Sequence, residues 1–296
     1  MNKITSISNL NRTFVEDLFL KTKLIKKSKI IQLGGFEGKT ICLLFFEKST
    51  RTKFSFELAA KRLGFNVLDF SEEISSMGKG ESLEDTLNTF VAMGVNGFVV
   101  RHPEDKISLK IAKLLPDNVF FINAGDGNHA HPTQALLDVF TIQENFQKID
   151  QLEVAILGDS KHSRVIPSFI ELLKLFNCNN LKFFGPPELL NQEHAPAFNG
   201  IKADAFSKTD VLFVLRIQKE RFQGFENINM KTFIEEFQIN TSVLKASNFS
   251  GLLMHPGPLN INHEITEEVA ASSSSLVLNQ VSNGVFLRTA LLQLIA

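Results

Sequence analysis

Residues 41–57 read ICLLFFEKSTRTKFSFE, an apolar run that passes into a cluster of hydroxyls and an arginine. The apolar run is typical of a buried strand, whereas the spacing of Phe54, Leu58 and Leu63 suits an amphipathic helix. Residues 49–52 therefore stand where a strand passes into a helix. Free N–H groups at a helix start favour an anion, and an arginine adds a two-pronged donor. The pattern predicts a phosphate site, although one hydroxyl here could also serve only as a helix cap.

Length and composition exclude several classes of protein. The chain has 296 residues, more than one core usually fills, so two domains are expected. A formal net charge of −1 argues against a general nucleic-acid binder, which needs a strongly basic face. The N-terminal MNKITSISNLNRTF has no signal-peptide core, and no apolar stretch reaches membrane-spanning length. We therefore expect a cytoplasmic protein with no membrane partner.

The sequence favours neither a metal nor a cofactor. Cys42 and Cys178 form no metal-ligand spacing and are expected to be plain buried or loop thiols. His129 and His131 lie in GDGNHAHP without a partner carboxylate at helical spacing, so hydrogen bonding to an oxygen is the preferred role for His131. Tyrosine does not occur, so no phenol serves as acid or base.

Short apolar runs alternate with amphipathic segments along the whole chain. The runs are ICLLFF, NVLDF, GFVVR, VFFIN, VAILG, LKFFG, VLFVL and GLLMH. This alternation predicts an α/β protein of two domains, each a doubly wound, Rossmann-like parallel sheet with helices on both faces. The expected boundaries are 1–133 for the first domain, 134–148 for an interdomain helix and 149–279 for the second domain. A C-terminal helix at about 280–296 is expected to pack back on the first domain.

Charged and polar groups follow the predicted strands repeatedly. In open parallel sheets, ligands bind beyond the carboxyl ends of the strands. Arginines bind planar oxyanions through paired hydrogen bonds, and Arg51, Arg101, Arg164 and Arg216 come from both predicted domains. Two polyanionic substrates that meet at a cleft are therefore expected. The chain lacks a nucleophile elbow, a Walker lysine motif and a GxGxxG turn, so nothing requires a covalent nucleophile or a bound nucleotide.

Eight ordered motifs resemble those of the aspartate/ornithine transcarbamoylase family. They are FFEKSTRTKFSFE, KGESLEDT, VVRHP, INAGDG, HPTQALLD, HSRV, RIQKER and MHPGP. The resemblance extends over nearly the whole chain and is to the catalytic chains of the aspartate branch. It implies transfer of the carbamoyl group of carbamoyl phosphate to the amino group of L-aspartate, the committed step of de novo pyrimidine (UMP) biosynthesis. The first domain would then bind carbamoyl phosphate and the second aspartate.

The resemblance also assigns roles to individual residues. Those assigned to carbamoyl phosphate are Ser49, Thr50, Arg51, Thr52, Arg101, His131, Gln134, Gly257 and Pro258. Of these, the residues expected to stabilise the reacting carbonyl or phosphate are Arg51, Thr52, Arg101 and His131. Gln134 and the carbonyl of Pro256 would hold the carbamoyl amide. The residues assigned to aspartate are Lys79, Arg164, Arg216 and Gln218, and Glu47 would hold Arg164 and Arg221 when the domains close.

The resemblance further implies an active site shared between subunits. Lys79 and either Ser75 or Ser76 would enter from a neighbouring chain, which makes a homotrimer the expected active unit. A regulatory chain and dihydroorotase are both partners that the resemblance allows. A degenerate homologue that only binds anions would have lost at least one of the key arginines or His131, and all are present.

Ornithine is the alternative acceptor within the family. The sequence SSMG at 75–78 contains the ornithine enzymes' SMG, but it precedes KGE in the first domain, whereas the ornithine motif belongs where this chain has RIQKER. Arg216 would repel an ornithine ammonium, so aspartate is favoured. Two departures from the family are Lys53, where an arginine is common, and LNINHE after HPGP, which lacks an arginine that many relatives carry. The loop after HPGP is therefore expected to close differently.

Overall fold

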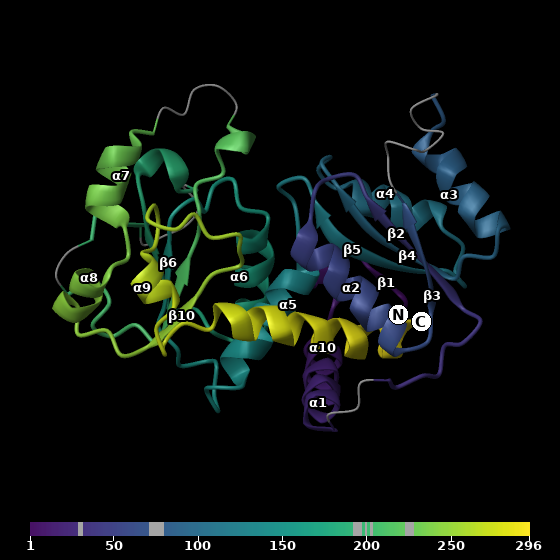
Figure 1. Cartoon of the computed structure of the whole chain (residues 1–296), viewed down its shortest axis with the longest axis horizontal. Coiled ribbons are helices and arrows are strands. Elements are labelled where there is room, and N and C mark those ends of the chain that lie inside the picture. Colours follow the sequence, from purple (N-terminus) through teal and green to yellow (C-terminus); the bar gives the residue numbers. More distant parts are fainter. Residues whose placement is uncertain (29–31, 71–79, 192–196, 199, 202–203, 223–227) are drawn as a thin grey trace. The chain divides into compact units, whose positions relative to one another are not determined.

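The structure is a computed structural model that describes residues 1–28, 32–70, 80–191, 197–198, 200–201, 204–222 and 228–296. The chain divides into two compact units (Figure 1). Unit 1 comprises residues 1–137, 167–172 and 281–296, and unit 2 comprises residues 138–166 and 173–280.

Unit 1 is built on a parallel five-stranded sheet in the order β1-β5-β4-β2-β3. The chain leaves β2 for β3 on one side and then returns to β4 on the other side. The carboxyl ends of β2 and β4 therefore lie at a topological switch point, where α/β sheets bind ligands. The strands are β1 (Lys3–Ile4), β2 (Thr40–Phe45), β3 (Asn66–Phe70), β4 (Gly97–His102) and β5 (Phe120–Asp126). The helices are η1 (Ile7–Asn9), α1 (Arg12–Ser28), α2 (Thr50–Arg62), α3 (Leu83–Ala92), α4 (Ile107–Leu114) and most of α10 (Val277–Ile295).

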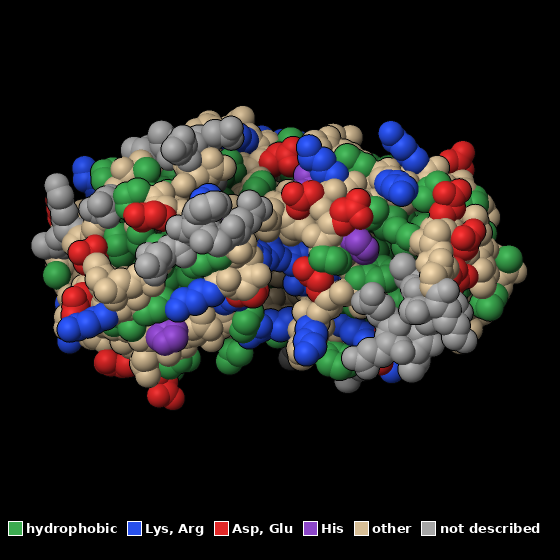
Figure 2. Space-filling model, turned by 90° about the horizontal axis from the view of Figure 1, so that it is seen from above, with side chains coloured by type: hydrophobic (Ala, Val, Ile, Leu, Met, Phe, Trp, Pro, Cys, Tyr) green, Lys and Arg blue, Asp and Glu red, His purple; other side chains and the backbone are tan. Residues whose placement is uncertain are grey.

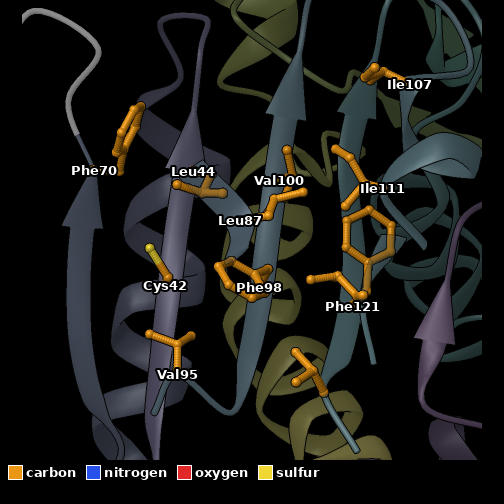
Figure 3. Packing of buried hydrophobic residues seen from close by; sticks show 12 residues of the cluster. Cys42, Leu44, Phe70, Leu87, Val95, Phe98, Val100, Ile107, Ile111 and Phe121 are labelled. Carbon is orange, nitrogen blue, oxygen red and sulfur yellow. The ribbon is translucent and has the colours of Figure 1, made fainter. Parts of the chain in front are cut away.

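Helices cover both faces of this sheet. Figure 3 shows Cys42, Leu44, Phe98 and Phe121 in one apolar cluster, to which α3 and α4 contribute Leu87, Ile107 and Ile111. Because side chains alternate along a strand, the remaining buried residues of β2 point to the other face. There α2 contacts β2 and β3, and Arg288 of α10 lies 5.0 Å from the ring centroid of Phe56 in α2.

The two thiols are expected to be inert in the folded protein. Cys42 and Cys178 are both 0% exposed, and burial raises the pKa of Cys42 to about 12 and that of Cys178 to about 11. The thiolate is the reactive form, so neither should react with an aromatic disulfide reagent at pH 8. Both should react after unfolding in urea, with N-acetylcysteine as the reagent control. Rapid stoichiometric labelling of the native protein would contradict this expectation.

Unit 2 contains a second parallel five-stranded sheet, in the order β10-β9-β6-β7-β8. Here the chain proceeds from β6 to β7 and β8 and then returns to β9, which creates a switch point between β6 and β9. The strands are β6 (Val154–Leu157), β7 (Leu181–Phe184), β8 (Ala197–Phe198), β9 (Val211–Val214) and β10 (Leu252–Met254). The helices are η4 (Pro187–Leu189), η5 (Lys219–Arg221), α7 (Met230–Phe237), α8 (Thr241–Ala246) and α9 (Glu267–Ala270). Helix α6 (Val165–Leu175) is divided, because its residues 167–172 belong to unit 1 and its two ends to unit 2. The doubly wound α/β prediction is confirmed in both sheets.

Helix α5 (Pro132–Gln143) carries the chain from one unit to the other, and the division falls between Leu137 and Asp138. It begins at Pro132, two residues before the predicted start at 134, as suits a residue without an N–H, and it ends five residues before the predicted end at 148. The amide of Asn145 donates to the Thr141 carbonyl at 2.9 Å, and the Asn145 N–H donates to the Ile142 carbonyl at 2.9 Å. These bonds close the last turn, so the helix stops there.

Candidate active site

The start of α2 lies at the switch point of the first sheet. Ser49 is the N-cap residue and has an extended backbone, with φ −158° and ψ 100°. Within the described residues, its side chain accepts no hydrogen bond from the first turn of α2. Ser49 therefore does not cap this helix through its hydroxyl. The first turn carries no acidic residue. The N–H groups and hydroxyls of this first turn therefore form the positive end of the helix, which suits an anion.

Arg51 and Thr52 lie in the first turn of α2 and differ in exposure. Arg51 is exposed, whereas the Thr52 side chain is buried, at 5% exposure. Partial desolvation lowers the pKa of the Arg51 guanidinium from its usual 12.5. An arginine nonetheless keeps its charge at neutral pH. Arg51 is therefore a fixed cation that is accessible to a ligand beside the helix N-terminus.

Arg101 reaches the same switch point from β4. Its backbone pairs with Phe45 of β2, and its carbonyl accepts the N–H of Phe46 at 2.9 Å. Its Nε atom donates to Oε2 of Glu47 at 3.2 Å, and both side chains are largely buried. Glu47 was expected to hold Arg164 and Arg221 when the domains close, which stays a prediction. In this structure it orients Arg101, which adjoins the segment that leads to residues 49–52.

His131 and Gln134 come from the start of α5, just beyond β5. His131 is 4% exposed, and its backbone N–H donates to the hydroxyl of Ser168 at 3.0 Å. Gln134 is partly exposed, and its N–H donates to the His131 carbonyl at 3.1 Å. The imidazole of His131 is thus placed by a helix start that is itself anchored to α6.

A buried carboxylate fixes the loop that leads to His131. Asp126, at 1% exposure, accepts hydrogen bonds from the Ser108 hydroxyl at 2.6 Å and from the Asn123 amide at 2.9 Å. The Nδ1 atom of His129 lies 3.1 Å from each of its oxygens. A buried carboxylate with this many partners holds its loop in one conformation.

In unit 2, Asp159 joins the two loops at the switch point of the second sheet. It is 0% exposed, and it accepts the N–H of His162 at 3.1 Å and the N–H of Gln218 at 3.0 Å. Arg221 adds a second tie, since its Nη1 atom donates to the His162 carbonyl at 3.1 Å. Arg164, 4% exposed, is the N-cap residue of α6 within the first loop. These hydrogen bonds therefore fix the segment that carries Arg164 relative to the segment that carries Gln218.

Arg216 follows β9 and is paired with Glu220. Its two terminal nitrogens bind the two carboxylate oxygens of Glu220, one of them at 3.1 Å. The Arg216 side chain is 22% exposed and that of Glu220 is 54% exposed. In this structure Glu220 therefore occupies the guanidinium fork, and an acceptor carboxylate would have to displace it.

We expect the pKa of Glu220 to show whether its carboxylate is paired with Arg216. The hydrogen bond from Arg216 lowers the pKa of Glu220 below its usual 4.5. Because the folded pKa is lowered, the stabilisation from this pair is present at neutral pH and is lost as the pH falls through the lowered value. A carboxyl-detected NMR titration should place the Glu220 midpoint below 4.5, and Arg216→Ala should return it to the ordinary value. An unshifted midpoint in the parent protein would contradict the pairing.

The remaining predicted residues lie in two places. Pro256, Gly257 and Pro258 follow β10 in unit 2, and Gly257 has φ +68°, a conformation that favours glycine. Ser75, Ser76 and Lys79 lie outside the described residues. Sequence reasoning missed Asp126, Asp159 and Ser168. The signal for the two aspartates was their position at the carboxyl ends of β5 and β6, in AGDG and GDSK.

The surface and the side-chain clusters give further constraints. Figure 2 shows Lys and Arg side chains interspersed with Asp and Glu over the visible face, so on that face an anion would be recognised by local groups. Among the described residues, no set of three or more His, Cys, Asp and Glu side chains is arranged to ligate a metal ion. None of the described helices combines the length and apolar content needed to cross a bilayer.

Comparison with known proteins identifies the family. The carbamoyl-P binding domain of aspartate/ornithine carbamoyltransferase matches residues 2–144, and the Asp/Orn binding domain matches residues 150–295. The aspartate carbamoyltransferase catalytic subunit of Legionella pneumophila (strain Lens) is 38% identical over 294 residues, which cover 99% of this chain and 98% of that protein. The corresponding subunit of Coxiella burnetii (strain Dugway 5J108-111) is 38% identical over 300 residues, with 98% and 95% covered.

Solved structures agree with the sequence relatives. Aspartate transcarbamoylase from Trypanosoma cruzi in complex with carbamoyl phosphate and aspartate is similar with a TM-score of 0.86 and 29% identity, over 98% of this chain and 95% of that one. The same enzyme in complex with N-(phosphonacetyl)-L-aspartic acid gives a TM-score of 0.85 and 29% identity, over 98% and 94%. On this evidence, the chain belongs to the aspartate/ornithine carbamoyltransferase family.

Proposed function

We propose that this chain transfers the carbamoyl group of carbamoyl phosphate to the α-amino group of L-aspartate, giving N-carbamoyl-L-aspartate and phosphate. The observation that carries the proposal is the pair of switch points, each bordered by arginines. One cluster consists of a helix N-terminus with Arg51 and Arg101, which suits a phosphate. The other contains Arg164 and Arg216, two guanidinium groups that suit a dicarboxylate once Glu220 is displaced from Arg216.

Most of the residues assigned to the donor lie in unit 1, and Pro256, Gly257 and Pro258 come from unit 2. Ser49, Thr50, Arg51 and Thr52 hold the phosphate through hydroxyls, backbone N–H groups and the Arg51 fork. Thr52, Arg101 and His131 stabilise the carbonyl oxygen, on which negative charge grows as the tetrahedral intermediate forms. Gln134 and the Pro256 carbonyl hold the carbamoyl amide, and Gly257 and Pro258 line the place where the two substrates meet. The hydrogen bonds that hold Arg101 and His131 in place favour this role, because preorganised groups need no reorganisation during the reaction.

The acceptor binds through unit 2, and the chemistry needs little beyond positioning. Arg164, Arg216 and Gln218 neutralise and orient the two carboxylates of aspartate. The amine forms a C–N bond to the carbamoyl carbon, the C–O bond to phosphate breaks, and the departing phosphate takes the amine proton. The phosphate leaving group already activates the carbonyl, so alignment and fixed charge supply most of the acceleration.

We further propose that the active unit is a homotrimer in which a neighbouring chain supplies Lys79 and Ser75 or Ser76. Phe54 and Leu58, 53% and 51% exposed and one turn apart on α2, leave an apolar strip that a second chain would cover. Light scattering should give three times the 33.1-kDa mass of one chain. Lys79→Ala and Arg51→Ala should each be inactive alone. Mixed trimers of the two variants should recover activity, because some of their sites combine an intact Arg51 from one chain with an intact Lys79 from its neighbour. A monomeric active enzyme would contradict this arrangement.

The product indicates a pathway, a cellular location and candidate partners for this chain. N-carbamoyl-L-aspartate feeds pyrimidine (UMP) biosynthesis, so we place the enzyme in that pathway and in the cytoplasm, with a regulatory chain or dihydroorotase as candidate partners. The deciding experiment is product formation by the purified protein from carbamoyl phosphate with aspartate and, in parallel, with ornithine. Carbamoyl-aspartate alone is the expected result. Citrulline, or no product with either acceptor, would mean that Arg164 and Arg216 do not form an aspartate site.

A further inference from the structure

The loop that carries Pro256, Gly257 and Pro258 is closed by a buried histidine–glutamate pair. His255 and Glu264 border this loop between β10 and α9, and each is 1% exposed. The Nε2 atom of His255 lies 3.1 Å from Oε1 of Glu264. These are two strongly polar groups in a position where water does not reach them, next to the segment that we assign to the carbamoyl group.

The hydrogen bonds define the tautomer of the histidine. The N–H of Gly257 donates to Nδ1 of His255 at 2.8 Å, so Nδ1 must carry a lone pair. The ring proton therefore resides on Nε2 and is donated to Glu264. The same Oε1 atom of Glu264 accepts the N–H of Asn260 at 2.7 Å. One carboxylate oxygen thus ties both ends of the segment from Pro256 to Asn260.

A second set of buried hydrogen bonds anchors the base of this loop. The N–H of His255 donates to the side-chain oxygen of Gln280 at 3.0 Å. The amide of Gln280 in turn donates to Asp138 of α5 at 2.7 Å. Gln280 is 2% exposed and Asp138 is 0% exposed. The loop is therefore attached through directional bonds to α5 and to the start of α10.

The energetics favour a role in orientation rather than in stability alone. Desolvating polar or ionic groups is costly, and an apolar pair of similar volume often stabilises a core as well or better. What a hydrogen-bonded pair adds is direction, because it holds the N–H groups of Gly257 and Asn260 at defined positions. In catalysis, a displacement of about 1 Å in a positioned group can cost about 100-fold in rate.

We propose that His255 and Glu264 are positioning residues for carbamoyl transfer. They touch no substrate, and they fix the Pro256 carbonyl, Gly257 and Pro258 where the carbamoyl group binds. This inference rests on the proposed function, since the loop matters for rate only if carbamoyl phosphate is the donor.

The test compares Glu264→Leu with Glu264→Gln in the full-length protein. Glutamine keeps an oxygen that can accept from both His255 and Asn260, whereas leucine removes it. We expect Glu264→Leu to lower kcat by about 100-fold and Glu264→Gln to stay within a few-fold of the parent. The Kd for inorganic phosphate should not change in either variant, because residues 49–52 lie in unit 1. Glu267→Leu, at an exposed glutamate three residues away, is the matched control.

A structural readout separates the loop from the chemistry. Amide hydrogen exchange at Gly257 and Asn260 should accelerate in Glu264→Leu and remain slow in Glu264→Gln. Should the leucine variant fail to fold, His255→Asn serves in its place. The side-chain carbonyl of the asparagine can still accept the N–H of Gly257, but this shorter side chain cannot reach Glu264. The kcat of His255→Asn should therefore fall.

Two results would overturn the proposal: parent-like kcat in Glu264→Leu, or equal losses in the leucine and glutamine variants. A parent protein that forms no carbamoyl-aspartate would instead refute the proposed function. The two failures are therefore distinguishable.

Discussion

Arg51→Ala is expected to reduce turnover to background, a loss of at least about 10³-fold, because it removes the fixed cation at the proposed phosphate site. Binding of a phosphonate analogue should be lost together with turnover. The fold should be intact, since the Arg51 side chain is exposed on the first turn of α2. Steady-state kinetics, calorimetry with the analogue and circular dichroism measure these three quantities.

Two further variants sharpen the Arg51 test. Arg51→Lys keeps the charge but loses the two-pronged donor, so it should recover only part of the activity. Arg12→Ala removes an arginine of the same unit whose exposed pair with Glu16 lies on α1, and it should be silent. Near-normal activity of Arg51→Ala would remove the phosphate assignment.

Arg216→Ala should act on the acceptor alone. The guanidinium fork is replaced by a methyl group, so two charge-assisted hydrogen bonds to an acceptor carboxylate are lost. At about 1.5–3 kcal/mol for each such bond, the KM for aspartate should rise by roughly two orders of magnitude or more. The Kd for carbamoyl phosphate should be retained, because its assigned ligands on unit 1 are untouched.

Neighbouring residues provide the controls for Arg216. Lys219→Ala removes an exposed cation from the adjoining η5 turn and should leave both affinities unchanged. If Arg216→Ala weakened carbamoyl phosphate and aspartate equally, the division of the substrates between the two clusters would be wrong.

Much of this architecture could be predicted from local sequence. The run ICLLFF became β2, and STRT stands at the start of α2, because a buried strand and a helix start both leave short-range signatures. The doubly wound arrangement followed from the alternation of such segments. The two-residue strands β1 and β8 were missed, since a pattern of period two needs more residues than they contain.

The supports of the site could not be predicted in this way, because their partners lie far apart in sequence. Asp159 accepts from Gln218, 59 residues away, and the Gln280 side chain donates to Asp138, 142 residues away. Only the fold brings such groups together. The pair of Arg216 and Glu220 is different: its spacing of four residues was visible in RIQKER, but η5 is too short to have marked it as a helix pair.

The second sheet has a consequence for redesign. The residues assigned to the acceptor, Arg164, Arg216 and Gln218, all follow the carboxyl ends of β6 and β9, within one unit that has its own sheet and core. If the assignment holds, acceptor choice is set within this one unit. Grafting a new loop after β9 should therefore change which acceptor amine is recognised, while the phosphate ligands assigned to unit 1 stay unchanged.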